Sequence, residues 1–316
     1  MRNPRHPAAV AGDHEHRSGA GHRGHDQLRR RGRGPGEAGG GRRAEVGVVR
    51  AAVRLRRGRA GDRGRARGAG VVGRHVGHPD LRTAPAAGLQ PAQTAQAATH
   101  GRFRLGLALG AKNLLEGSFG LTYERPVARL REFLTVLREL FTTGTADFRG
   151  EVLTAVPPLP ATVPGADPVP LLVAAMGPQA LRATGELADG TLPYLAGPKV
   201  LAGEIVPAIT AAASGQPRVI AFVAGVVTSD VEQVRANAVE QLAFYERIPS
   251  YQRVIGLEGA SRAGELAVVG DEETVAAEVR RYFDAGATEV VFTQTDLGSA
   301  EDQRRTWRLL GELSGK

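Results

Sequence analysis

The 316-residue chain contains no cysteine. Disulfides, thiolate metal ligands and cysteine nucleophiles are therefore excluded. No run of 18 apolar residues occurs, so no transmembrane helix is expected. The basic N-terminal stretch also lacks the apolar core of a secretory signal. These absences predict a cytoplasmic protein that does not enter a membrane.

Aromatic residues are absent from the first third of the chain, where the first Phe, Tyr or Trp is Phe103. Residues 1–93 contain 20 Arg, no Lys and 7 acidic residues, a net charge of +13. Residues 94–316 contain 21 basic and 26 acidic residues, a net charge of −5. High net charge with little apolar surface is typical of disorder. The sequence predicts a disordered Arg-, Gly- and Ala-rich segment over residues 1–93, and a folded domain over residues 94–316.

Three explanations compete for residues 1–93. The basic tracts could neutralise nucleic-acid phosphates, but no aromatic residue is available for base stacking, so nucleic-acid binding is disfavoured. His14, His16, His22 and His25 could bind a metal, but no cysteine or spaced carboxylate accompanies them, so no metal site is predicted. The third explanation is GC-rich DNA translated out of frame, with the frame changing near residues 89–94. We favour it, with ordinary disorder as the alternative.

Strand and helix patterns alternate along the second part of the chain. The expected strands are 103–109, 169–174, 191–195, 218–227, 266–269 and 288–293, and the expected helices are 124–140, 179–188, 198–213, 230–245, 271–285 and 300–313. This alternation indicates an α/β fold with a parallel sheet covered by helices. Five strands, or six if 266–269 counts, fall short of the eight in a (β/α)8 TIM barrel. A βα unit takes roughly 30 residues, so residues 1–93 occupy the length of three units. The expected fold is a TIM-type barrel that is incomplete because its first three units are replaced.

Two turns that follow expected strands have the composition of ligand-binding turns. The first lies between an apolar strand and a helix and consists of Ala174, Ala175, Met176, Gly177 and Pro178. Free N–H groups at the start of that helix could bind a phosphate, although a tight turn without a ligand fits the same residues. Gly110 and Ala111 occupy the matching place after the preceding strand and are small enough to admit a flat ring. Lys112, beside them, is expected to be solvated.

Other polar residues give weaker signals. Glu186 and Asp189 flank the end of an expected helix, where a carboxylate more often caps a turn than catalyses. Tyr194 could line a pocket or lie in the core with its hydroxyl bonded. No plausible Ser/His/Asp set or dinucleotide fingerprint occurs, so the catalytic residues stay unknown.

Several stretches resemble the deazaflavin-dependent group of the luciferase-like monooxygenase family. They are Gly101–Leu107, Gly120–Pro126, Pro168–Pro178, Ala183–Gly190, Val269–Asp271 and Asp284–Thr288. The resemblance implies a (β/α)8 barrel that binds coenzyme F420, or alternatively FMN, at the carboxyl ends of its strands. It also implies hydride transfer between the reduced cofactor and a small organic substrate, and it is compatible with a homodimer.

By this resemblance, Ala174 to Pro178 contact the phosphate-bearing tail of the cofactor, and Gly110 and Ala111 lie near its ring. Residues that would contact the ring and the substrate at the ends of the first three strands have no counterpart in residues 1–92. The activity of the chain as written is therefore left open. A basic-tailed nucleic-acid-binding protein and an inactive barrel fragment are the alternative functions.

Overall fold

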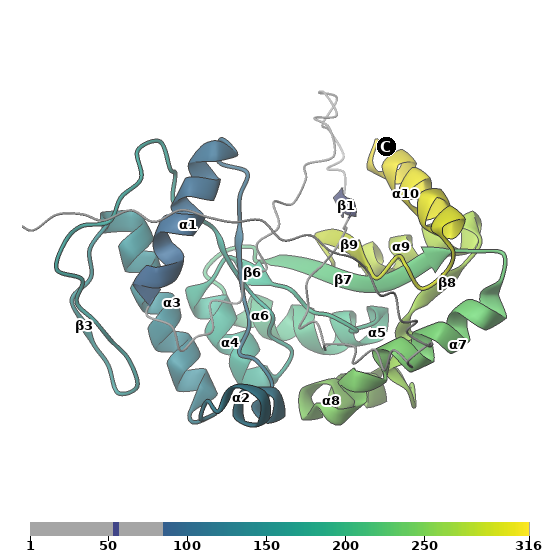
Figure 1. The fold of residues 1–316 in the computed structure, drawn as a ribbon, viewed down its shortest axis with the longest axis horizontal. Coiled ribbons are helices and arrows are strands. Elements are labelled where there is room, and N and C mark those ends of the chain that lie inside the picture. Colours follow the sequence, from purple (N-terminus) through teal and green to yellow (C-terminus); the bar gives the residue numbers. More distant parts are fainter. Residues whose placement is uncertain (1–52, 57–84, 316) are drawn as a thin grey trace, which may run out of the picture. The chain divides into compact units, whose positions relative to one another are not determined.

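Five parallel strands follow one another across a sheet in the order in which they occur in the chain (Figure 1). The computed structural model describes residues 53–56 and 85–315. The five strands are β2 (Leu105–Leu107), β5 (Leu171–Val173), β6 (Gly190–Thr191), β7 (Arg218–Val227) and β9 (Glu289–Thr293). Chain-order pairing of parallel strands is the arrangement of a (β/α) barrel wall.

Two further strands join this sheet outside that succession. β8 (Val268–Gly270) pairs in parallel with the last three residues of β7, and β1 (Val53–Arg56) pairs antiparallel with β9. The strand expected at 266–269 is thus β8, and it does not belong to the barrel wall. Five barrel strands are present in the described part of the chain, and they correspond to the strands predicted at 103–109, 169–174, 191–195, 218–227 and 288–293.

A helix follows each parallel strand. The helical elements are α1 (Pro85–Ala98), α2 (Lys112–Phe119), α3 (Pro126–Thr143), α4 (Pro178–Leu187), α5 (Pro198–Val200), a π-helical turn η1 (Leu201–Ile205), α6 (Val206–Ala212), α7 (Val231–Leu242), η2 (Ala243–Arg247), α8 (Pro249–Glu258), η3 (Ala263–Leu266), α9 (Glu272–Asp284) and α10 (Ala300–Ser314). A two-stranded hairpin, β3 (Phe148–Arg149) with β4 (Thr154–Ala155), interrupts the succession after α3.

The two faces of the sheet belong to different apolar clusters, because side chains alternate along a strand. On the outer face, Val219, Ala221 and Val223 of β7 join the main core with residues of the surrounding helices. On the inner face, Ile220 packs with Leu172 of β5 and Val291 of β9, and the half-buried Leu192 and Phe222 cover them. The inner face is therefore apolar over its middle layers.

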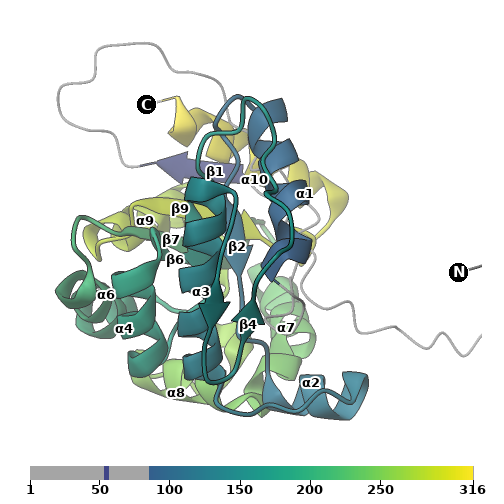
Figure 2. The same cartoon turned by 90° about the vertical axis from the view of Figure 1, so that its left-hand side faces the viewer.

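Helix α1 was not predicted from the sequence, and both α1 and the strand β1 correct the expectation of disorder over residues 1–93. Residues 85–93 were expected to be disordered, but Pro85–Ala98 is a helix whose Leu89 and Ala92 are buried. It runs alongside α3 (Figure 1, Figure 2). The Gln96 side chain accepts a hydrogen bond from the Phe103 amide at 2.9 Å. The expected boundary at residue 93 falls inside this packed helix, and the other expectations for residues 1–52 and 57–84 lie outside the described residues.

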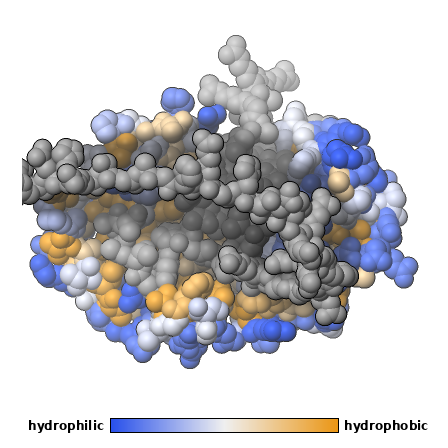
Figure 3. All heavy atoms as spheres, viewed as in Figure 1, coloured by the Kyte–Doolittle hydropathy of each residue, from blue (hydrophilic) through white to orange (hydrophobic). Residues whose placement is uncertain are grey.

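The C-terminal helix α10 is amphipathic. Thr306, Leu309 and Leu310 are buried, and the surface over this helix is mainly hydrophilic (Figure 3). Across residues 53–56 and 85–315, no helix has both the length and the apolarity that crossing a membrane requires.

Candidate active site at the carboxyl ends of the parallel strands

The carboxyl ends of parallel strands lie at one edge of their sheet, which is where barrel enzymes hold their ligands. Leu107, Val173 and Thr191 are in register at the ends of β2, β5 and β6. The edge continues through Tyr194, which bridges to Phe222 of β7. The residues singled out in the sequence follow these strand ends directly.

The turn after β5 is fixed to both neighbouring strands. The Ala174 amide donates to the Leu107 carbonyl of β2 at 2.8 Å. On the other side, the Thr191 hydroxyl lies 2.9 Å from the Val173 carbonyl oxygen and 3.0 Å from that of Ala175. Thr191 is fully buried, so this hydroxyl holds the turn from inside the protein.

Helix α4 begins without a side-chain cap. Gly177 is its N-cap in an extended conformation, and Pro178 is its first residue. A Cβ added to Gly177 would meet no atom within 4 Å, so open space lies beside the helix start. The first N–H groups of a helix lack intrahelical partners and carry the positive end of its dipole. This turn therefore offers an anion free donors and room to approach.

Among the other helices that follow sheet strands, only α2 shares this feature in the described part of the chain. Helix α2 also lacks a side-chain cap, since Ala111 is its N-cap. The four remaining helix starts each bind an oxygen from a side chain of the protein itself: Glu258 at α5, Asp230 at α7, Asp271 at α9 and Ser299 at α10. Uncapped starts among these helices thus occur at the two neighbouring strands β2 and β5, where the sequence placed the ligand-binding turns.

The turn after β2 needs glycine at Gly110. Its φ of +75° lies in the left-handed region, and a Cβ would lie 2.7 Å from the Leu115 side chain. Lys112 is mostly exposed and lies 4.0 Å from Glu116, which agrees with the expected solvated lysine. The structure thus brings Gly110–Ala111 and Ala174–Pro178 to adjacent turns. That these turns bind a cofactor stays a prediction.

Glu186 and Asp189 have structural roles, as expected. The Asp189 carboxylate accepts a hydrogen bond from the Leu171 amide at 2.8 Å. Glu186 pairs with Arg131 at 2.6 Å and with Arg182 at 3.0 Å. The hydrogen bond from Arg131, followed by that from Arg182, lowers the pKa of the Glu186 carboxyl.

A cluster of three tyrosines lies beyond the end of β6. The ring of Tyr194 packs edge-on against Tyr245 and Tyr251, with centroids 5.1 and 6.1 Å apart. The Tyr194 hydroxyl donates to Oε1 of Gln294, the residue that follows β9. Burial raises the pKa of Tyr194 well above its ordinary value. The sequence left core and pocket positions open for Tyr194, and it gave no signal for Gln294, because this contact spans 100 residues.

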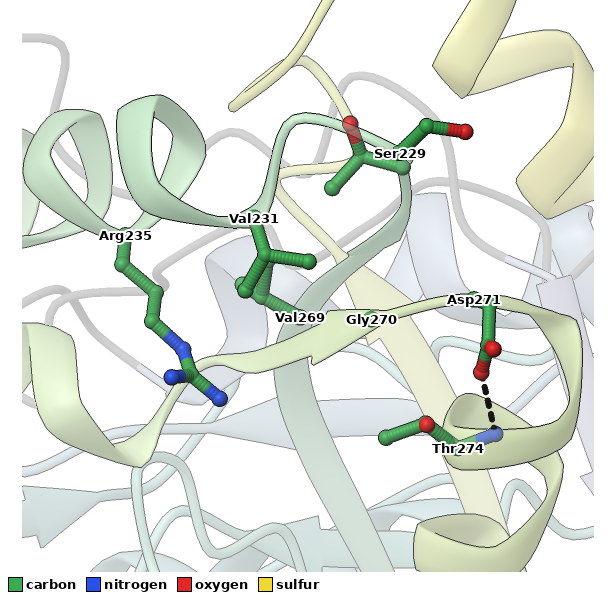
Figure 4. Close-up of a pocket in the computed structure, with 8 residues that line it drawn as sticks. Ser229, Val231, Arg235, Val269, Gly270, Asp271 and Thr274 are labelled. Atoms are coloured by element: carbon green, nitrogen blue, oxygen red, sulfur yellow. Dashed lines mark hydrogen bonds between the residues drawn. The ribbon is translucent and has the colours of Figure 1, made fainter.

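A separate cavity of about 450 Å³ opens where β7 and β8 end. Figure 4 shows Asp271 turned to the first turn of α9, where it accepts from the Thr274 amide at 2.9 Å, while Arg235 extends from α7 on the opposite side. Arg305 donates to the Ser229 hydroxyl at 3.0 Å. Several polar groups of this cavity are therefore engaged in capping helices and joining α10 to β7. None of the residues predicted to bind a cofactor lines this cavity, although the family-like stretch Val269–Asp271 does. The lining residues are Thr228, Ser229, Val231, Arg235, Val269, Gly270, Asp271 and Thr274.

Comparison with known proteins decides the family. The model of a family described as luciferase-like monooxygenase matches residues 77–289, about two thirds of the chain. The chain belongs to the luciferase-like monooxygenase family. It is therefore an oxidoreductase of that family. The match begins ahead of residue 93, so the family-like part includes helix α1.

Curated relatives cover different shares of the chain. An F420-dependent glucose-6-phosphate dehydrogenase of Amycolatopsis mediterranei is 26% identical over 74% of this chain and 75% of its own length. A phthiodiolone/phenolphthiodiolone dimycocerosates ketoreductase of Mycobacterium kansasii is 31% identical over 71% of this chain and 65% of its own length. A 5,10-methylenetetrahydromethanopterin reductase of Archaeoglobus fulgidus is 32% identical over 35% of this chain and 34% of its own length.

Solved structures share the fold. The coenzyme F420 dependent tetrahydromethanopterin reductase of Methanopyrus kandleri aligns with a TM-score of 0.56 at 20% identity, over 75% of this chain and 80% of that one. The EDTA monooxygenase of Chelativorans sp. BNC1 aligns with a TM-score of 0.53 at 14% identity, over 74% and 72%. These similarities show the TIM-barrel type of fold that the sequence predicted.

Proposed function

We propose that this luciferase-like protein uses coenzyme F420, with FMN as the alternative, to transfer a hydride between the cofactor and a small organic substrate. The names of several relatives include F420, and a monooxygenase of the same fold was solved with FMN. One observation carries the proposal: the two uncapped helix starts lie side by side, at the ends of β2 and β5.

The residues of these turns fit the phosphate-bearing part of either cofactor. Phosphates bind readily at the N-terminus of a helix because free N–H groups point at them. Gly177 leaves the start of α4 open, and Ala174 is small and exposed. The four helix starts that are filled by the protein's own oxygens offer no such place.

The chain contributes binding and positioning, while the cofactor supplies the hydride chemistry when it is bound. Thr191 fixes the turn through the Val173 and Ala175 carbonyls. The apolar layers of the inner face, with Leu192 and Phe222 outermost, exclude water from the floor of the site.

A negative charge placed at Gly177 tests whether the cofactor phosphate binds at the start of α4. Gly177→Asp adds a carboxylate that both caps α4 and repels an anion, whereas Gly177→Asn adds a neutral cap of nearly the same shape. Asp and Asn are similar N-caps, so both variants should be at least as stable as the wild type. We expect Gly177→Asp to weaken F420 binding by about tenfold, because repulsion replaces the attraction of the helix start. Gly177→Asn should bind within about threefold of the wild type.

The measurement is a titration that follows deazaflavin fluorescence, repeated with FMN. Equal binding by both variants would place the phosphate elsewhere. A wild-type chain that binds neither cofactor would favour the inactive-fragment alternative. Nucleic-acid binding was suggested by residues 1–93, which lie largely outside the described residues, and no contact in the described ranges favours it.

A further inference from the structure

Gln294 lies on the far side of the candidate site from helix α4. It follows β9, and β6 and β7 separate β9 from β5 in the sheet. Three strand spacings correspond to roughly 14 Å along the sheet. Gln294 is therefore too far from Gly177 to share an anion with it, and a ligand group at Gln294 is a separate feature of the site.

The inner face of the sheet leads towards this residue. Ile220, Phe222 and Ala224 alternate along one face of β7. Ile220 and Phe222 belong to the inner apolar layers, and Ala224 packs in the cluster that contains Tyr194. Thr293, the last residue of β9, pairs in register with Ala224. Gln294 thus lies directly beyond the apolar inner face of the sheet.

The side chain of Gln294 is held through its carbonyl oxygen. The Tyr194 hydroxyl donates to Oε1, and that bond determines which way the amide points. Within the part of the chain that the structure describes, the Nε2 group of Gln294 has no acceptor. Gln294 is half-buried, so two N–H donors remain available to a ligand from a fixed position.

The backbone on both sides of this bond is in the left-handed region. Gln294 has φ +48°, and Leu195, directly after Tyr194, has φ +53°. This conformation costs free energy for residues other than glycine, and it occurs preferentially at functional sites. Packing of the Tyr194 ring against Tyr245 and Tyr251 supports the arrangement.

The surroundings select a neutral ligand. The neighbouring rings are uncharged tyrosines, and burial raises the pKa of both Tyr194 and Tyr245, so they stay protonated near neutral pH. Helix α5, which follows β6, offers no free place for an anionic ligand, because its Val200 amide already donates to the Glu258 carboxylate at 2.9 Å. A fixed amide donor among aromatic rings suits a carbonyl oxygen on an apolar molecule.

We propose that Gln294 is a substrate-binding residue whose amide donates a hydrogen bond to the carbonyl oxygen of a neutral, largely apolar ketone or aldehyde. Tyr194 is the positioning residue that orients this amide. That this carbonyl compound is the substrate rests on the proposed function. That Gln294 binds a carbonyl compound does not depend on the proposed function.

The probe is 4-fluoroacetophenone, and its matched partner without a carbonyl is 1-ethyl-4-fluorobenzene. Ligand-observed fluorine NMR on the full chain gives both affinities. A single neutral hydrogen bond predicts a preference of about fivefold for the ketone. Gln294→Glu keeps an acceptor for Tyr194 but loses the donors, so the preference should vanish. Gln241→Glu makes the same chemical change at an exposed position and should keep the preference.

Gln294→Asn is a second variant that should fold normally, because asparagine tolerates the left-handed backbone conformation of this residue. Its shorter side chain withdraws the donor, so the preference should again be lost while the alkylbenzene binds unchanged. Tyr194→Phe should reduce the preference without changing alkylbenzene binding. A ketone that binds no better than the alkylbenzene, or a preference that persists in both Gln294 variants, overturns the proposal. F420 titration of the same samples reports separately on the proposed function.

Discussion

The Thr191 hydroxyl connects the core to the candidate site, because it holds the turn from which α4 begins. Thr191→Val keeps the shape of the buried side chain but removes the hydrogen bonds to Val173 and Ala175. We expect a loss of about 1–2 kcal/mol in the free energy of unfolding, since a buried carbonyl loses a partner. F420 binding should weaken as well, because the turn is no longer fixed.

Thr184→Val is the matched control. Thr184 is equally buried, but its hydroxyl bonds at 2.7 Å to Ala180 within its own helix. Removing such a bond is close to neutral for a helix, so cofactor binding should stay unchanged. Urea unfolding and the fluorescence titration check both variants. Equal effects of the two substitutions on binding would show that Thr191 has no special part in the site.

The buried tyrosines predict how stability depends on alkaline pH. Desolvation raises the pKa of Tyr194, Tyr245, Tyr251 and Tyr282 above their ordinary value. Above a pH of about 10 the unfolded chain releases these protons while the folded chain keeps them. The unfolded state then binds fewer protons, so the stability that these tyrosines contribute is fully present below a pH of about 10 and is lost as the pH rises further.

Absorbance at 295 nm reports tyrosine ionisation directly. On stepping the folded protein from pH 9 to pH 11, we expect these four tyrosines to stay neutral and to ionise only when the chain unfolds. Thermal melts over the same range should show a falling midpoint. Ionisation of all five tyrosines near pH 10 in the folded protein would contradict the burial of these four side chains.

At the scale of elements, the capping box of α10 supplies a defined test. The Ser299 hydroxyl accepts from the Asp302 amide, and the Asp302 carboxylate accepts from the Ser299 amide. Ser299→Ala should cost about 1 kcal/mol of stability. Ser314→Ala, at the far end of the same helix, should cost less, because a helix end is frayed. Chemical denaturation checks the pair, and a larger loss at Ser314 would refute the role assigned to the cap.

Elements with strong local patterns were predictable from the sequence. The β-branched run of β7 matches the expected 218–227, and α3 has buried residues at three- and four-residue spacing, as expected. Helix α2, in contrast, was missed because only Leu115 is buried in it. Helix α1 was missed for another reason, since it contains Pro91 and lies in an aromatic-free stretch. Tertiary packing on α3, which no local pattern reveals, stabilises it.

At the scale of the whole molecule, the candidate site likewise combines residues that the sequence indicated with residues that it did not. Gly110 and Ala174–Pro178 follow strands in the sequence, so their place at one edge of the sheet could be inferred from strand order. The Tyr194–Gln294 bond joins β6 to β9 across the fold, and the Glu258 carboxylate reaches α5 from a different helix. Those contacts join residues that are far apart in the sequence, so the sequence indicated Tyr194 alone among them and neither its partner Gln294 nor the role of Glu258.

The reading frame of the N-terminal part leads to a prediction for the complete protein. Because the family match begins at residue 77 and α1 is packed from Pro85, any change of frame lies upstream of the position first expected. The other frame of that upstream DNA should then encode three apolar strand–helix units. A protein that contains those three units should bind F420 about tenfold or more tightly than the printed chain, because three further strand–helix units would add contacts worth at least ~1.4 kcal/mol. Resequencing the gene, intact-mass measurement of the native protein and titration of both forms make the comparison. An unbroken frame, with a native mass equal to that of the printed chain, would rule out this account of residues 1–76.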